Sequence, residues 1–249
     1  MDQTASYELH PSPLSPTARV RRVRPEEKGR DPYDGLRPWS AITHGLGAVL
    51  AVAGAALLLV RAALLRLSPW HIVAFAIYGA SMVCLYTAST LYHCLNTPVK
   101  GRLALRKLDH ASIYLLIAGS YTPLCLGPLR TAGGWGWALF GVIWGLALAG
   151  TAMTLCWVNA PRWVTSTVYI AMGWVALVAM APLSRALGAS GLTWLLVGGI
   201  LYTIGGVLYA LKWPGRDNPR FGCHEIFHVF ILLGSIAHFV MFYTVFTNL

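Results

Sequence analysis

Long apolar segments recur along most of this 249-residue chain, and they constrain its fold more than any other feature. Charged residues make up only 11% of the sequence, whereas a soluble domain carries about 25%. A helix needs roughly 20 apolar residues to cross a bilayer. We therefore predict an all-α polytopic membrane protein, folded as a bundle of seven transmembrane helices. The predicted spans are about residues 40–65, 70–95, 108–128, 133–156, 164–184, 191–212 and 222–247.

Lysine and arginine are distributed unequally between the two ends of these spans. Of the 19 basic residues, 15 fall in the N-terminal tail or in loops on its side, and 4 fall on the opposite side. Because cytoplasmic loops are enriched in basic residues, we predict a cytoplasmic N-terminus and a C-terminus outside. Membrane orientation also explains the net charge of +10, so this charge does not indicate a nucleic-acid-binding surface.

The composition also divides the chain into two predicted parts. Residues 1–38 are rich in Pro, Arg and Glu and lack the apolar core of a signal peptide, so we expect a disordered basic tail. Residues 39–249 are expected to form the seven-helix transmembrane domain. The five cysteines are scattered without a C-x-x-C pair, which argues against a disulfide framework.

Ionisable residues are rare in the transmembrane part and are predicted to gather at one depth. The acidic residues beyond residue 38 are Asp109, Asp217 and Glu225. Ionisable groups at membrane depth are costly and usually mark a functional site. The topology places His93 at the cytoplasmic end of the second span and Asp109 at the cytoplasmic start of the third. It places His224 and His228 in the first turns of the seventh, so groups distant in the chain share one membrane depth.

These residues have the chemistry of a metal site. His224 and His228 are four residues apart, so they project from one helix face and can bind one ion. His93 supplies a third imidazole, and three histidines with one open position are typical of catalytic zinc. Asp109 would orient a water or accept its proton, and Ser89 lies one helical turn before His93. We predict zinc as the cofactor, with Asp109 and Ser89 as the catalytic residues.

Three other polar residues leave alternatives open. His44 begins the first span on the cytoplasmic side and could lie behind the metal ligands. His238 lies about 15 Å further along the helix than His228, and it could line an inner cavity. Glu225 completes H-E-I-F-H, a zinc metalloprotease pattern in which the glutamate is a general base. Intramembrane metalloproteases carry their aspartate motif later in the chain, whereas Asp109 comes earlier.

An ion or proton transporter is a further alternative, with His44 and His238 as relay groups. Few acidic groups lie within the predicted spans, and no internal repeat is visible. Many transporters are built from internal repeats, so the sequence favours a metal-dependent protein over a transporter.

Several of these segments resemble haemolysin III proteins, the bacterial branch of the progestin and adipoQ receptor superfamily. The resemblance covers about residues 38–247, and its motifs recur in order along the chain. The matching segments are Ser89–His93, Lys107–Ile113, Ala118–Pro123 and His224–His228 with the later His238.

The resemblance implies a seven-helix bundle with zinc at its cytoplasmic side. The zinc ligands would be His93, His224 and His228, and Asp109 would bind through a water with Ser89 beside the site. Receptor relatives carry glutamine at the position of Glu225, which argues against a general-base role for that residue.

The wider superfamily is similar to alkaline ceramidases, which implies hydrolysis of a lipid amide. We therefore predict a multi-pass protein of the bacterial inner membrane that hydrolyses a lipid amide or ester, with a membrane lipid as substrate or ligand. Ser89 would help to stabilise the oxyanion. The alternative is a non-enzymatic receptor, membrane-homeostasis factor or cytolysin in which zinc joins three helices. The sequence leaves the lipid and the oligomeric state open.

Overall fold

A computed structural model describes residues 36–215, 218 and 220–246 of the chain. The predicted basic tail, residues 1–38, lies outside the described residues except for its last three. The first helix begins at Pro38, next to the predicted start of the transmembrane domain.

The described residues are helical and contain no strand. Their α-helices overlap the predicted spans. In chain order the elements are α1 Pro38–Leu64, α2 Pro69–Cys94, α3 Val99–Leu126, α4 Trp135–Cys156, α5 Arg162–Gly173, the 3₁₀ helix η2 Trp174–Ala179, α6 Met180–Leu211 and α7 Cys223–Val245.

Five segments of the described chain are long and apolar enough to cross a membrane. One of them, Arg162–Leu211, runs for 50 residues, and its backbone turns at Gly188. Gly188 has φ 62° and ψ −174°, a conformation that a residue with a side chain rarely adopts. This break falls where the sequence predicted a boundary between two spans. The protein is an all-α polytopic membrane protein, as predicted.

The third predicted span begins earlier than expected. α3 starts at Val99 rather than near residue 108, and its first turns carry four basic residues. The buried Arg102 guanidinium lies over the Tyr92 ring at 4.4 Å and donates to the Tyr92 carbonyl oxygen at 2.7 Å. Hydropathy shows where a helix is apolar, but it cannot show that the helix continues past the membrane. Arg102 thereby joins the start of α3 to the end of α2, close to His93.

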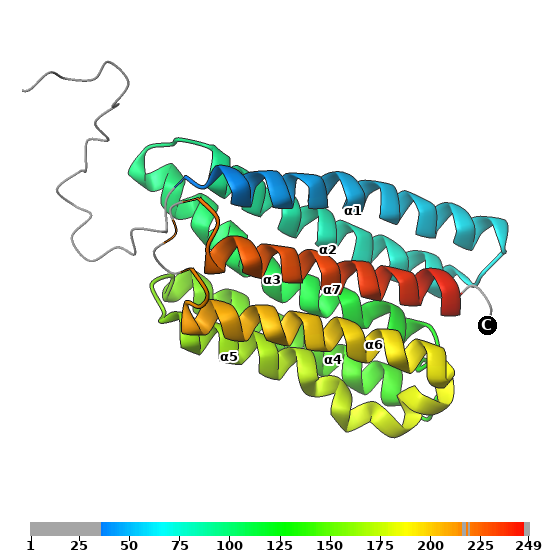
Figure 1. Cartoon of the computed structure of the whole chain (residues 1–249). Helices are drawn as coiled ribbons and strands as arrows, with labels where there is room; N and C mark the ends of the chain where they lie inside the picture. The colour runs from blue at the N-terminus through cyan, green and yellow to red at the C-terminus, as the bar shows by residue number, and fades with distance from the viewer. Residues whose placement is uncertain (1–35, 216–217, 219, 247–249) are drawn as a thin grey trace, which may run out of the picture. The chain divides into compact units, whose positions relative to one another are not determined.

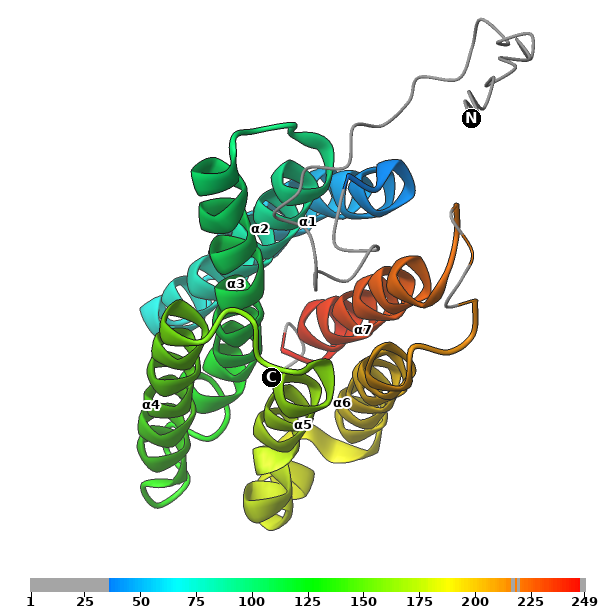
Figure 2. The same ribbon diagram turned by 90° about the vertical axis from the view of Figure 1, so that its left-hand side faces the viewer.

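The consecutive helices α1 and α2, α2 and α3, α3 and α4, and α6 and α7 run antiparallel and lie side by side (Figure 1). α2 packs between α1 and α3, while α6 packs between α5 and α7, and α7 returns to α1. α4 lies against the outer side of α3, as the end-on view shows (Figure 2). This arrangement brings the end of α2 and the starts of α3 and α7 to the same end of the bundle.

α3 is the most deeply enclosed of these helices. Fifteen of its 28 residues are buried, whereas only eight of the 27 residues of α1 are. α1 instead exposes large apolar side chains such as Ile42, Val49 and Val52, as a helix facing lipid does. Because α3 is enclosed by other helices, it can carry polar residues such as Asp109 that would be costly on a helix facing lipid.

Candidate metal centre

Three buried imidazoles from two helices converge near one end of the bundle. His93 comes from the last turn of α2, and His224 and His228 come from the first two turns of α7. One nitrogen from each ring lies within 4.8 Å of the others. All three side chains are buried, with 1%, 7% and 2% of their surfaces exposed. The sequence placed these three residues at one membrane depth, and the fold brings them into one cluster.

The spacing of the ring nitrogens fits a bound metal ion. Nε2 of His93 lies 3.1 Å from Nε2 of His224. Two nitrogens bound tetrahedrally at about 2.0–2.1 Å from one ion would lie roughly 3.3 Å apart. Imidazole nitrogens suit transition-metal ions such as zinc, copper, iron and nickel. The His93–His224–His228 triad can therefore hold such an ion.

A ligand histidine usually needs a partner for its other ring nitrogen, and His228 has one. Its Nδ1 lies 3.3 Å from the carbonyl oxygen of Ser40 on α1, so Nδ1–H donates and Nε2 is left free for a metal. The ring of His44 stacks on His228 with ring centres 3.5 Å apart and planes at 10°. α1 thus fixes the orientation of His228 although it contributes no member of the triad.

Glu225 lies in the same H-E-I-F-H segment, but its hydrogen bonds do not fit the general-base role that this pattern suggests. Its carboxylate accepts hydrogen bonds from Arg37 Nη1 at 2.7 Å and from the Ser40 hydroxyl at 2.8 Å. It also accepts one from the Gly222 backbone N–H at 2.9 Å, which caps the start of α7. We call Arg37, Ser40 and Glu225 the α1–α7 clamp. Because each carboxylate oxygen is engaged, Glu225 serves to hold α1 against α7.

Asp109 and Ser89 lie beside the triad but outside it. Asp109 is buried about three turns into α3, where it interacts electrostatically with His93 and His110. Its Oδ2 is 3.4 Å from Nδ1 of His110, and that nitrogen is 2.9 Å from the Arg106 carbonyl oxygen. Ser89 is buried next to Asp109, and its hydroxyl meets no described group with good hydrogen-bond geometry.

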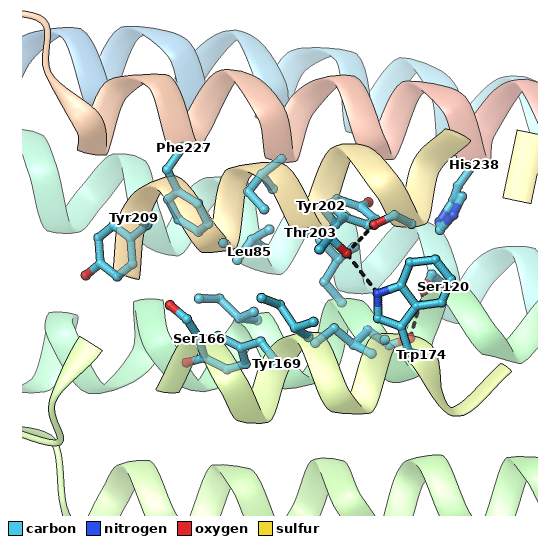
Figure 3. Close-up of a pocket in the computed structure, with 18 of the residues that line it drawn as sticks. Leu85, Ser120, Ser166, Tyr169, Trp174, Tyr202, Thr203, Tyr209, Phe227 and His238 are labelled. Atoms are coloured by element: carbon cyan, nitrogen blue, oxygen red, sulfur yellow. Dashed lines mark hydrogen bonds between the residues drawn. The ribbon is translucent and has the colours of Figure 1, made fainter. Parts of the chain in front are cut away.

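An internal cavity begins at this cluster and extends along the bundle between α2, α3, α5, α6 and α7. At the metal end, its lining includes Asp109, Ser89, His224 and His228. Figure 3 shows Tyr209, Phe227 and Tyr169 at one end of the cavity and Tyr202, Trp174 and His238 at the other. Most of the wall between them is apolar, from residues such as Ile113, Leu116, Ile117, Leu196 and Ile231. The cavity can accept an alkyl chain whose polar end lies near the triad.

Two predictions about the outlying histidines can be placed in this geometry. His44 lies directly behind His228, in the position expected of a supporting residue. His238 lines the cavity far from the triad. His110, next to Asp109 in the chain, also lines the cavity and lies close to the Asp109 carboxylate.

The residues that sequence reasoning missed are Arg37 and Ser40. The sequence did contain a signal for these partners. Glu225 is a lone carboxylate near the end of a span, and a buried carboxylate needs a cation or hydrogen-bond donors. Arg37 directly precedes the first span on the same predicted side. Only the tertiary structure identifies Arg37, rather than another basic residue of that side, as the partner.

Comparison with known proteins finds relatives along most of the chain. Residues 38–239 match the family described as Haemolysin-III related. The chain is 41% identical over 208 residues to the "Hemolysin-3 homolog" of Bacillus subtilis (strain 168), covering 83% of this chain and 93% of the relative. It is 40% identical over 206 residues to "Hemolysin-3" of Bacillus cereus, covering 82% and 90%.

A more distant similarity extends to mammals. The chain is 27% identical over 210 residues to the human "Monocyte to macrophage differentiation factor", covering 79% of each chain. The match to the family spans α1 to α6 and most of α7, so it includes every member of the triad. The chain therefore belongs to the haemolysin III family, as its motifs predicted.

Proposed function

We propose that this protein is a zinc-dependent hydrolase of lipid amides or esters that works inside the membrane. One observation carries the proposal: three buried histidine nitrogens lie within 4.8 Å of one another at one end of a largely apolar cavity. Three histidines leave one coordination position open, as catalytic zinc sites do and closed structural sites do not.

Each residue near the triad then has a chemical role. Zinc, when bound, would polarise a carbonyl group and make a water acidic enough to deprotonate near neutral pH. Asp109 would orient that water and accept its proton, because it is the carboxylate that lines the described cavity. The Ser89 hydroxyl would donate to the oxygen that gains negative charge. His44 and the Ser40 carbonyl would keep His228 in place.

The cavity supports a lipid as the substrate. Its wall is apolar beyond the triad and includes no lysine or arginine among the described residues, which suits an alkyl chain attached to a neutral amide or ester. We propose that the triad faces the cytoplasm, that the protein lies in a bacterial inner membrane, and that the chain before Arg37 is a basic tail.

The test joins metal analysis to hydrolysis by the purified full-length protein. We expect about one zinc ion per chain, and loss of most of it in His93→Ala, His224→Ala and His228→Ala. His71→Ala is the matched control, because His71 lies at the opposite end of α2 from His93. Zinc-loaded wild type should release fatty acid from a panel of lipid amides and esters. Full zinc occupancy with no release from any lipid would refute the hydrolase.

A second candidate is a non-enzymatic protein in which zinc only joins helices. The α1–α7 clamp and the contact of His93 with α7 favour it, because they tie α1, α2 and α7 together at one end. One relative carries the name "Hemolysin-3", so lysis of cells is one activity to assay.

The two candidates differ in the effect of Asp109→Asn. For a hydrolase we expect zinc to stay bound while fatty-acid release falls by about 100-fold or more, the usual range for loss of a general base. For zinc that only joins helices, neither wild type nor Asp109→Asn should release fatty acid, Asp109→Asn should keep its zinc and its melting temperature, and His93→Ala should destroy the fold. Zinc content, thermal unfolding and fatty-acid release of both variants decide between them.

A further inference from the structure

A second polar cluster lies beside the cavity, where Tyr202 of α6 and His238 of α7 line the wall at the end away from the triad (Figure 3). Tyr86 of α2 and Ser235 of α7 complete the cluster through hydrogen bonds but do not line the cavity. The Tyr86 hydroxyl donates to Ser235 Oγ at 2.7 Å, and Ser235 Oγ lies 2.9 Å from the Tyr202 hydroxyl. The rings of Tyr202 and His238 meet edge to face with centres 5.4 Å apart. Figure 3 shows Tyr202 and His238 together with Trp174 at this end.

His238 offers a hydrogen-bond acceptor in this cluster. Its side chain is 93% buried, and its Nε2 lies 3.4 Å from the Leu195 carbonyl oxygen. If Nε2 carries the proton and donates it to that carbonyl, Nδ1 is left as an acceptor. No group in the described part of the chain makes a hydrogen bond to this nitrogen. A buried polar atom without a partner costs free energy, so its retention beside a cavity points to a ligand.

Tyr202 offers a matching donor. The hydrogen bond between Ser235 Oγ and the Tyr202 hydroxyl can run in either direction; when Ser235 is the donor, the Tyr202 oxygen accepts. The Tyr202 hydroxyl then has its own proton to give, and among the described residues it meets no second acceptor. A hydrogen-bond acceptor on His238 and a donor on Tyr202 together suit a ligand group that both donates and accepts hydrogen bonds, such as a neutral hydroxyl.

The position of the cluster sets where that hydroxyl would lie in a ligand. His238 is ten residues beyond His228 on α7, which corresponds to about 15 Å along the helix. The wall between them is mainly apolar, with Ile231 on α7 itself. A carboxylate or ammonium group is disfavoured here, because Asp109, at the metal end, is the charged residue in the described lining.

We propose that the Tyr202–His238 cluster is a binding site for a hydroxyl group carried well down the alkyl chain of a lipid. The proposal deepens the lipid hydrolase proposed above and rests on it, because the head of that lipid would lie at the triad. The preferred substrate is thus a lipid whose acyl chain is hydroxylated far from its amide or ester group.

Binding of three fatty acids to zinc-loaded, full-length protein tests this proposal. The acids are stearate, 2-hydroxystearate and 12-hydroxystearate, measured by displacement of a fluorescent fatty acid. We expect 12-hydroxystearate to bind about tenfold more tightly than the other two, as two modest hydrogen bonds would provide. Tyr202→Phe and His238→Phe should abolish the preference while retaining stearate binding.

Tyr78→Phe is the matched control for Tyr202→Phe. The Tyr78 hydroxyl donates to the Ser235 carbonyl oxygen at 3.3 Å from outside the cavity, so its loss should leave the preference unchanged. Equal binding of the three acids by wild type, or a preference that persists in both cluster variants, overturns the proposal. Equal binding of the three acids would indicate that a water, rather than a lipid hydroxyl, hydrogen-bonds to His238 Nδ1.

Hydrolysis of the corresponding amides separates this proposal from the hydrolase itself. Equal cleavage of stearoyl and 12-hydroxystearoyl amides, with equal binding of the acids, refutes the hydroxyl site and leaves the hydrolase standing. Preferential binding of 12-hydroxystearate without cleavage of either amide refutes the hydrolase and leaves the hydroxyl site standing.

Discussion

The carboxylate of Glu225 illustrates how one residue type can suggest two opposite roles. Its place in an H-E-x-x-H pattern is that of a general base. In the structure it accepts hydrogen bonds from Arg37, Ser40 and the Gly222 N–H, and only 2% of its side chain is exposed. A base must be free to take a proton from water, so a carboxylate held this way acts as a structural anchor.

This assignment predicts that Glu225→Gln keeps its zinc and loses less than about tenfold of its hydrolytic activity, because an amide can still accept from Ser40 or Arg37. Removal of a general base would cost about 100-fold or more. Zinc content and fatty-acid release measured on the same preparation check the prediction. Near-complete loss of activity with full zinc content would instead make Glu225 catalytic.

Arg37→Met should be more damaging to stability than Glu225→Gln. It leaves a buried carboxylate without its cation, and breaking a buried ion pair costs about 3 kcal/mol or more. Thermal unfolding should therefore shift markedly downward, and the Arg37→Met, Glu225→Gln double variant should recover much of the loss. If the double variant is no more stable than Arg37→Met alone, the ion pair is not the source of the effect.

At the scale of elements, the buried helix α3 depends on close approach of its neighbours. A Cβ atom at Gly119 would lie 2.6 Å from Ser81 Cβ on α2 and would overlap the Ser81 hydroxyl. Real side chains do not approach so closely, so the spacing of α2 and α3 requires glycine here. This contact helps to keep Ser89 of α2 and Asp109 of α3 at their relative positions.

Gly119→Ala should therefore destabilise the bundle by about 1–3 kcal/mol, the usual cost of overpacking. Gly141→Ala is the matched control, because a Cβ at Gly141 on α4 meets nothing within 4 Å. That control should be neutral or stabilising by up to about 1 kcal/mol, since alanine favours a helix over glycine. Thermal unfolding of the two variants in the same detergent checks the difference, and equal melting temperatures would contradict it.

At the scale of the whole molecule, polar interactions and basic residues gather at the end of the bundle that carries the triad. Lys107 donates to the Leu155 carbonyl oxygen at 2.7 Å and Arg106 to the Asn159 side chain at 2.9 Å, joining the start of α3 to the end of α4. The starts of α1 and α7 lie at this end as well (Figure 1). Its basic character supports our proposal that this end faces the cytoplasm.

Cysteine labelling in intact cells tests that orientation. Cys94 and Cys156 are exposed at the ends of α2 and α4, on the proposed cytoplasmic side. In variants that keep a single cysteine, a membrane-impermeant thiol reagent should label neither until the membrane is permeabilised. A cysteine introduced at the exposed Thr131, between α3 and α4, should react in intact cells. The reverse pattern of labelling would invert the topology.

Sequence patterns predicted the helices well because each signal is local. An apolar run of about 20 residues needs no partner to be recognised as a span, and the break at Gly188 was visible as a small-residue interruption. The start of α3 at Val99 was missed, because Lys100 and Arg102 look like loop residues. Arg102 is held in the helix by contacts with Tyr92, which lies on another element.

The sequence by itself determined the all-α membrane class, the family, and the shared depth of His93, His224 and His228, because hydropathy, charge bias and i,i+4 spacing are properties of one chain read in order. Only the tertiary structure decided which side chains touch. It joined Arg37 to Glu225 and stacked His44 on His228. It also placed Tyr202 beside His238 along the cavity. Depth follows from position along a helix, whereas contact depends on how each helix is rotated about its axis, and packing against its neighbours sets that rotation.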